Sequence, residues 1–396
     1  MSAFNRRRLL QTAGAAALAP FAARGADAPP PTLPWPDRIP PLAPIRASTD
    51  RLFDLTVCLR PFRAQGPRIE AEHIGHALVV HNYGHGGSGW SLSWGSGTLA
   101  LRLAMQRNPR EIAVIGCGAI GLTTAILAQE AGAKVTIYAK DLLPDTRSAR
   151  ATGSFTPDSR IALTDRVAPD FGDRWEEMAR ISFHRYRRYL GLPGTPVEWN
   201  DRYYLSDFGP NDTPPPKTPD PSALDFAEYT DRIRDLIGHS QELPADATPF
   251  PVRGVRRGST MMFNIADYGH TLMQDFLIAG GKFVKHEFRS LAELGHLKEK
   301  VVINCPGYGA RALCKDESVV PVRGQIGWLV PQPEVDYGIA YRGVLALSRK
   351  DGICIQMVSG GDMRGYGDDN ETVNRAESEE GVNIIADLYS RFRSQT

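Results

Sequence analysis

The amino-acid sequence predicts an α/β protein of about two domains, built around a Rossmann-type unit of strand, tight turn, helix and strand. Two observations carry this prediction. A short apolar strand, Ile112 to Ile115, is followed at once by the glycine pattern Gly116-Cys117-Gly118-Ala119-Ile120-Gly121 and then by a segment of helical composition. The chain also has 396 residues, 42% hydrophobic and 23% charged, which is typical of a folded enzyme with ample core.

Charge and cysteine content exclude several function classes. With 46 basic and 45 acidic residues, the chain has no net field that would attract nucleic acid or an anionic membrane. Its five cysteines show no CxxC spacing, so neither a disulfide framework nor a cysteine zinc site is indicated. The histidines at positions 73, 76, 81 and 85 lack a carboxylate that would complete a ligand pattern. We therefore expect no nucleic-acid partner and no metal.

Residues 1–28 are typical of an export signal. The run Asn5-Arg6-Arg7-Arg8-Leu9-Leu10-Gln11 precedes a weakly apolar stretch, Thr12 to Ala23, and small residues near Ala26. These features indicate a twin-arginine signal, which sends folded protein to the periplasm. The alternative is a membrane anchor, but the stretch contains Pro20 and falls short of the roughly 20 residues that span hydrocarbon. We expect the twin-arginine export machinery as a partner and no stable membrane insertion.

Residues 29–50 are predicted to be a Pro-rich tether. Eight prolines lie between Ala26 and Ala47, and a segment so poor in N–H donors is unsuited to a helix or an inner strand. We expect an extended tether or surface strap.

Regular elements are expected directly after the tether. Asp54 to Arg60 alternates as a strand does, Arg68 to Val80 is typical of a hairpin, and Ser91 to Met105 is typical of a helix.

The glycine pattern predicts that the chain binds a dinucleotide. Gly116 permits the tight turn, Gly118 lets the backbone approach a pyrophosphate, and Gly121 lets the helix pack on the strand. The N-terminus of the helix expected over Leu122 to Ala131 offers free N–H groups to the phosphates. The second strand is expected over Lys134 to Tyr138.

The position that normally binds the ribose departs from the usual pattern. A carboxylate is expected just after the second strand, but Lys140 stands there and Asp141 follows it. Either Asp141 binds the ribose through a one-residue shift, or the contact comes from elsewhere.

Three further segments resemble those of the D-amino acid oxidase family. His81 to Trp90 ends a run of strand-forming residues and resembles the strand, Gly-rich turn and helix that lie against the flavin in these enzymes. Pro144 to Gly153 resembles their flavin-contacting loop, and Val301 to Gly307 resembles a later strand and turn beside the dinucleotide. The resemblance implies FAD instead of NAD, in a Rossmann-type FAD-binding domain joined to a mixed-sheet substrate-binding domain.

The order of these segments implies a circularly permuted member of the family. The Gly-rich strand and its helix are C-terminal in relatives, but here they precede the glycine pattern. The short connector Gln106 to Glu111 can join that helix to the first Rossmann strand, and the new end falls after the helix expected over Glu377 to Phe392.

The resemblance implies which residues contact the cofactor. They belong to the glycine turn, the end of the second strand, the flavin loop, the strand near the adenine and the Gly-rich turn. The full set is Gly116, Gly118, Ala119, Ile120, Gly121, Lys140, Asp141, Thr146, Arg147, Ser148, Thr152, Gly153, Phe288, Gly86, Gly87, Gly89, Trp90 and Ser91.

The resemblance also implies a substrate site. Arg60 occupies the position of an arginine that holds the substrate carboxylate, for which a guanidinium offers two parallel donors. Tyr341 and Tyr337 follow Arg323-Gly324-Gln325-Ile326 as the family's active-site tyrosines do, although another register places Leu345 where one tyrosine belongs. The carbonyl of Gly87 is expected to accept from the substrate amino group.

These implications together predict an FAD-dependent amine oxidoreductase. It would oxidise a D-amino acid by hydride transfer to flavin N5, and the imino acid would hydrolyse to a 2-oxo acid and ammonia while oxygen becomes hydrogen peroxide. The alternatives are an amino acid dehydrogenase with another electron acceptor, a glycine or sarcosine type of amine oxidase, and a non-catalytic FAD-binding protein.

The predicted organisation after the tether has five segments. They are a permuted segment (51–110), an FAD-binding Rossmann core (111–165), a first part of the substrate domain (166–258), a second part of the FAD-binding domain (259–316), and the substrate-domain sheet with the C-terminal helix (317–396).

Overall fold

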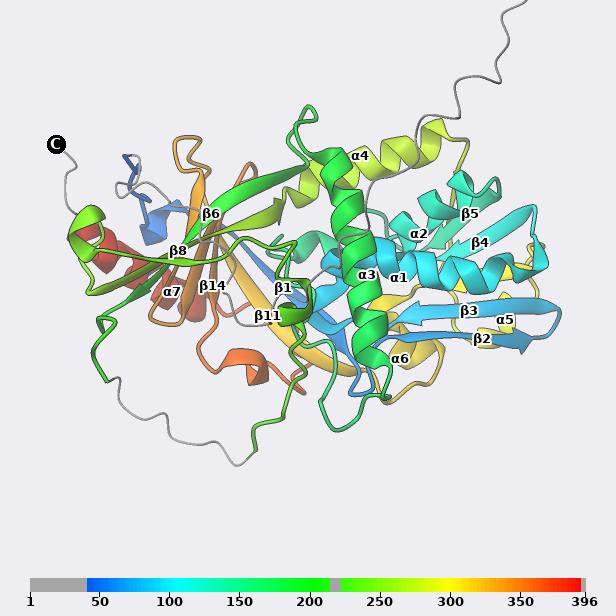
Figure 1. Cartoon of the computed structure of the whole chain (residues 1–396). Helices are drawn as coiled ribbons and strands as arrows, with labels where there is room; N and C mark the ends of the chain where they lie inside the picture. The colour runs from blue at the N-terminus through cyan, green and yellow to red at the C-terminus, as the bar shows by residue number, and fades with distance from the viewer. Residues whose placement is uncertain (1–40, 214–221, 393–396) are drawn as a thin grey trace, which may run out of the picture. The chain divides into compact units, whose positions relative to one another are not determined.

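The computed structural model describes residues 41–213 and 222–392, which fold into two β-sheets with helices (Figure 1). The predicted export signal, 1–28, lies outside the described residues, as does the tether up to residue 40. No helix in the described ranges is long and apolar enough to cross a membrane.

The six-stranded sheet contains the Rossmann unit predicted from the glycine pattern. Its order is β2-β3-β10-β4-β5-β9, and β3, β10, β4, β5 and β9 run parallel while β2 pairs antiparallel at the edge. The strands are β2 (Arg68–Ile74), β3 (Ala77–Tyr83), β4 (Glu111–Ile115), β5 (Lys134–Ala139), β9 (Lys282–Lys285) and β10 (Val301–Asn304). The inner strands β3, β4 and β10 are short runs of mainly apolar residues because both faces of the sheet are covered there.

Four helices belong to the core of this sheet. They are α1 (Gly89–Ala104), α2 (Ala119–Glu130), α3 (Phe171–Tyr186) and α4 (Ile265–Ile278). Helix α1 packs against α2, α3 and β3, and α2 packs against α4 (Figure 1). Two one-turn helices, α5 (Leu291–Leu294) and α6 (Ala310–Leu313), contribute Leu294 and Leu313 to a separate small cluster with Val79, Ala113 and Val302.

The eight-stranded sheet is mixed. Its order is β1-β11-β14-β13-β12-β6-β8-β7, with β12 and β6 parallel and the other pairs antiparallel. Helix α7 (Arg375–Ser390) packs on β14, β11 and β13. The strands are β1 (Leu52–Phe62), β6 (Val197–Ser206), β7 (Gln241–Leu243), β8 (Gly254–Phe263), β11 (Val320–Leu329), β12 (Tyr337–Tyr341), β13 (Val344–Arg349) and β14 (Gly352–Met357).

Residues 52–104 contribute to both sheets. Strand β1 pairs with β11 at the edge of the mixed sheet, while β3 pairs with β10 inside the parallel sheet. The strand, hairpin and helix expected here from the sequence are confirmed. Circular permutation itself stays a proposal.

The described end of the Pro-rich segment is a strap. Leu42, Ala43 and Ile45 belong to the core that includes β12 and α7, and the carbonyl of Ala43 accepts a hydrogen bond from Tyr337 at 2.7 Å. The strap therefore holds the start of the described chain beside its C-terminal helix.

Two predicted segment boundaries differ from the strands and helices. Strand β8 continues to Phe263, so the mixed sheet extends past residue 258. Helix α3 lies in the predicted first part of the substrate domain, yet Trp175, Met178 and Phe183 pack in the core of the parallel sheet. The apolar face of α3 is covered by α1, which ties this helix to the nucleotide-binding part of the chain.

Candidate active site

A nucleotide cavity lies at the carboxyl ends of β3, β4, β5 and β10. The segments that line this nucleotide cavity lie far apart in the sequence but converge in the fold. They are 58–61, 82–87, 89–90, 116–120, 139–141, 146–148, 150–152 and 305–308. Parallel strands of one sheet bring their following loops to the same edge, which explains this convergence. Of the cofactor residues expected from the sequence, those that line the cavity are Gly86, Gly87, Gly89, Trp90, Gly116, Gly118, Ala119, Ile120, Lys140, Asp141, Thr146, Arg147, Ser148 and Thr152.

Two glycines of this cavity have no room for a side chain. Gly116 has φ +95°, and a Cβ there would lie 2.4 Å from the carbonyl oxygen of Cys305. Gly86 has φ +54°, and a Cβ there would lie 1.8 Å from the carbonyl oxygen of Arg160. Both turns thus depend on glycine for conformation and for space.

The walls of the nucleotide cavity fit the polar groups of FAD. Thr146 Oγ1 and Asn82 Nδ2 are buried and have no hydrogen-bond partner among the described residues, so a ligand can supply one. Ser148 Oγ accepts from the N–H of Ala119 at 3.0 Å, and its carbonyl accepts from Trp90 Nε1 at 2.8 Å. The flavin loop, the glycine turn and α1 are thereby fixed to one another around the site.

The expected ribose end of the cavity carries opposite charges. Lys140 Nζ lies 3.9 Å from a carboxylate oxygen of Asp141 and 3.7 Å from one of Glu287. Both Lys140 and Asp141 line the cavity.

Four expected cofactor residues do not line the nucleotide cavity. A Cβ on Gly121 would lie 2.1 Å from the carbonyl oxygen of Gly116, and one on Gly153 would lie 2.4 Å from that of Phe263, so both serve close packing. The hydroxyl of Ser91 accepts from the N–H of Thr156 at 2.8 Å. The ring of Phe288 packs on Tyr138 with centroids 6.0 Å apart, just beyond the end of β9.

A second cavity of about 310 Å³ adjoins the first. We name it the arginine cavity because Arg60, Arg160, Arg202, Arg323 and Arg364 line it. Arg60, Gly87 and Thr152 line both cavities. These three residues mark the junction at which a molecule in the arginine cavity would meet a cofactor in the nucleotide cavity.

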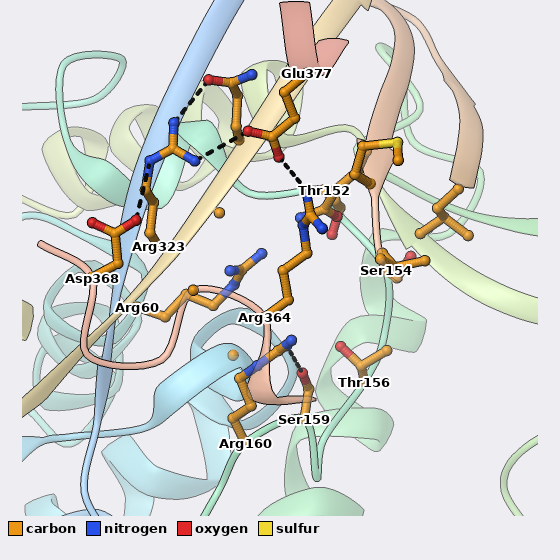
Figure 2. Close-up of a pocket in the computed structure, with 18 of the residues that line it drawn as sticks. Arg60, Thr152, Ser154, Thr156, Ser159, Arg160, Arg323, Arg364, Asp368 and Glu377 are labelled. Atoms are coloured by element: carbon orange, nitrogen blue, oxygen red, sulfur yellow. Dashed lines mark hydrogen bonds and ion pairs between the residues drawn. The ribbon is translucent and has the colours of Figure 1, made fainter. Parts of the chain in front are cut away.

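Arg60 points into this junction without a protein partner. Figure 2 shows its side chain between Arg323 and Arg160, with no interaction drawn to it. Within the described residues no hydrogen-bond or ion-pair partner of its guanidinium is present, and burial lowers the pKa of this group. A Cβ on Gly324 of β11 would lie 2.2 Å from Arg60 Nη1. The Arg60 side chain therefore fits here because residue 324 is a glycine.

The guanidinium of the neighbouring Arg160 already has partners within the protein. Arg160 donates to the carbonyls of Asp362 at 2.8 Å and Gly361 at 2.9 Å, and its Nη1 lies 3.2 Å from the Asp362 carboxylate. Burial and the positive charge of Arg60 lower the pKa of Arg160 to about 10. The two guanidiniums therefore produce a positive field at the junction, and Arg60 is the one with donors left to bind an anion.

The structure does not bring the expected tyrosines to either cavity, which corrects that expectation. Tyr337 is buried in the core beneath the strap, and its hydroxyl lies 2.8 Å from that of Tyr389. The hydroxyl of Tyr341 donates to Asp207 at 2.9 Å. Leu345, which the alternative register placed at a tyrosine position, lines the arginine cavity instead.

Several lining residues were missed by the sequence reasoning. They include Arg202 on β6 and the hydroxyl residues Ser154, Thr156 and Ser159 that follow the flavin loop. No motif in the sequence marked Arg202.

The histidines of β3 and its turn have structural partners. His81 Nε2 lies 2.6 Å from Glu72, and burial lowers the pKa of His81. His85 Nε2 lies 2.6 Å from Ser96 Oγ, and burial lowers the pKa of His85 to about 3. Among the described residues no group of three or more His, Cys, Asp or Glu side chains is placed to hold a metal ion.

Comparison with known proteins gives one family. The sequence model of the family described as FAD dependent oxidoreductase (DAO) matches residues 111–395. A D-amino acid oxidase of Dugesia ryukyuensis is 25% identical over 252 residues, which cover 62% of this chain and 68% of the relative. A D-amino-acid oxidase of Streptomyces coelicolor is 29% identical over 220 residues, covering 54% and 58%. The chain thus spans between 58% and 68% of the length of these relatives.

Among solved structures, glycine oxidase from Geobacillus kaustophilus is similar with a TM-score of 0.41 and 12% identity. The match covers 72% of this chain and 96% of that protein.

Proposed function

Because the chain belongs to the family of FAD dependent oxidoreductases, we propose that it oxidises the carbon–nitrogen bond of a D-amino acid. The imino acid formed would hydrolyse to a 2-oxo acid and ammonia. FAD, the cofactor of this family, would supply when bound a two-electron acceptor for the α-hydrogen, and oxygen would be the final acceptor, reduced to hydrogen peroxide. Support for the D-configuration comes from relatives named as D-amino acid oxidases.

The unpartnered guanidinium of Arg60 carries this proposal. A buried cation without a carboxylate partner is costly, and the carboxylate of an amino acid would complete it with two parallel hydrogen bonds. Because Arg60 lines both cavities, a carboxylate held there places the α-carbon beside the cofactor.

Backbone groups of the Gly-rich turn would complete the orientation. Gly87 also lies at the junction, where its carbonyl can accept from the substrate amino group. Helix α1 begins at Gly89, so the positive end of its dipole faces the nucleotide cavity and favours negative charge that develops there. No dedicated acid or base is required for hydride transfer, and the residues act by binding and orientation.

Anaerobic reduction of the bound flavin tests the proposal. Holoenzyme under nitrogen is mixed with D-amino acids, L-amino acids, glycine and N-methyl amino acids, and bleaching of the flavin absorbance is followed. We expect reduction by D-amino acids, and oxygen uptake with peroxide release when air is admitted. Reduction by L-amino acids alone, or by none of these compounds, contradicts the proposal. Reduction without oxygen uptake, but with transfer to an artificial acceptor, would identify a dehydrogenase.

A further inference from the structure

Two of the five arginines that line the arginine cavity have no carboxylate partner in the part of the chain that the structure describes. The three paired ones have short contacts: Arg160 with Asp362 (3.2 Å), Arg323 with Glu377 (3.3 Å) and Arg364 with Glu377 (2.7 Å). Figure 2 shows Glu377 between Arg323 and Arg364. The unpaired arginines are Arg60, assigned above to the α-carboxylate, and Arg202.

Arg202 is a buried cation with donors left over. The residue is only 7% exposed, and it lies on β6, an inner strand of the mixed sheet. One terminal nitrogen donates to Ser154 Oγ at 2.7 Å, while Nε is buried without a partner among the described residues. Burial lowers the pKa of Arg202, which indicates that its charge is poorly compensated.

Arg202 lies close enough to the junction for one small ligand to reach both. Ser154, which it contacts, is two residues after Thr152, and Thr152 lies at the junction with Arg60. Two residues of chain span at most about 7 Å. An amino acid bound at the junction can therefore extend its side chain towards Arg202.

The cavity wall between these points is polar. Thr156, Ser159 and Gln356 offer hydroxyl and amide groups, while the apolar contribution comes from Leu345, Met357 and Val358. A polar wall with a buried cation disfavours an apolar side chain, since binding one would leave these groups without partners.

We propose that the substrate carries a second carboxylate on its side chain, that this carboxylate binds Arg202, and that the enzyme therefore acts on acidic amino acids of the aspartate and glutamate class. This inference rests on the proposed function, because it takes Arg60 as the partner of the α-carboxylate. A dicarboxylic substrate pairs both unpaired guanidiniums, while a neutral amino acid leaves one of them unpaired.

The first test compares acids with their isosteric amides. Holoenzyme under nitrogen is titrated with D-aspartate, D-glutamate, D-asparagine and D-glutamine, and flavin reduction is followed. The acids are expected to reduce the flavin at concentrations at least tenfold lower than the amides. Equal or better reduction by the amides overturns the inference but leaves the proposed function standing. Reduction by no amino acid rejects the proposed function itself.

The Arg202→Gln variant tests whether Arg202 causes the preference for acidic amino acids. This substitution removes the charge but keeps a group that can form a hydrogen bond with Ser154. The concentration of D-aspartate that reduces half of the flavin should rise by tenfold or more. The corresponding concentration of D-asparagine should change by less than about threefold. Arg202→Lys should restore part of the preference as a point charge. Arg256→Gln is the matched control, because Arg256 is exposed on the neighbouring strand β8 and stacks on Tyr204 at 5.1 Å. An equal loss for acid and amide in Arg202→Gln contradicts the assignment.

Binding without oxidation gives an independent readout. Succinate should perturb the flavin absorbance of wild-type holoenzyme at lower concentrations than butyrate does, and this difference should vanish in Arg202→Gln. N-carboxymethylglycine, whose second carboxylate is carried on nitrogen, tests where the second charge lies. If it reduces the flavin more readily than D-aspartate and D-glutamate do, the side-chain position is wrong.

Discussion

Arg60 is the residue on which the proposed chemistry depends. Arg60→Ala should leave FAD bound but raise the amino acid concentration needed for flavin reduction. Removing one member of a buried charge-assisted pair typically costs about 3 to 5 kcal/mol, which corresponds to a hundredfold or more in affinity. The measurement is a titration of flavin reduction under nitrogen.

Arg63 provides the matched control for Arg60. It follows β1 directly, but its guanidinium donates to Ser318 at 2.9 Å and to the carbonyl of Gly66 at 2.9 Å. Arg63→Ala should therefore lower the thermal stability and leave the substrate titration unchanged. If both variants reduce as readily as wild type, Arg60 is not the carboxylate partner.

The sequence located some site residues and missed others for identifiable reasons. Arg60 was placed through the resemblance of its segment to the D-amino acid oxidase family, whereas the glycines of the first turn were placed by the spacing that the turn geometry fixes. Tyr337 and Tyr341 were misplaced because a strand pattern does not fix register, and Leu345 on the next strand faces the cavity instead. Arg202 was missed because it reaches the site only through strand pairing with distant parts of the chain.

Among the elements, the turn from β3 to α1 should make the stability of the folded protein depend on pH. His85 is buried at 2% exposure and bonds Ser96 of α1, and its folded pKa of about 3 lies below the usual 6.5. The unfolded chain binds the proton more readily, so stability is complete above pH 6.5 and falls as the pH drops towards 3. At pH 5 the loss from this one group is about 2 kcal/mol.

Urea unfolding of holoenzyme at pH 5 and pH 7.5, with excess FAD, measures this effect. His85→Gln keeps a polar group near Ser96 and does not titrate, so its free energy of unfolding should change less between the two pH values than that of wild type. Other buried groups, such as His81, contribute equally to both proteins. An unchanged pH difference in His85→Gln means that the turn does not control acid stability.

The elements were predicted unevenly, and their environments explain why. The strands of the parallel sheet are short apolar runs beside a glycine turn, and the expected segments match β3, β4, β5 and β10 closely. Strands β6 and β8 were not anticipated. They place Arg202 and Arg257 in buried positions, and such polar residues dilute the hydrophobic alternation that marks a strand.

At the scale of the whole molecule, three observations support circular permutation. The family match begins at residue 111, where β4 starts the Rossmann unit. Residues 52–104 nevertheless complete both sheets. The strap and the end of α7 share one core, in which Tyr337 bonds both Ala43 and Tyr389, so the ends of the described chain lie close together.

A rearranged chain tests this proposal. Residue 392 is joined to residue 41 by a short Gly/Ser linker, and the chain is opened between Arg110 and Glu111. Because no strand or helix is interrupted, the variant should fold and bind FAD as the parent does. Flavin absorbance after purification and thermal unfolding are the measurements. The matched control opens the same joined chain inside α2, between Ala125 and Ile126, and should not fold. Failure of the first variant would show that the present order is essential to the fold.

The pairing of the first strands with late ones has a consequence for the newly made chain. Cys58 of β1 lies opposite Gly324 of β11, and Val80 of β3 lies opposite Ile303 of β10. At about 5–20 residues per second, a ribosome needs on the order of ten seconds or more to supply these partners. During this time β3, all of whose residues are buried in the finished protein, lacks its inner neighbour in the sheet. Both sheets can therefore be completed only when most of the chain has left the ribosome.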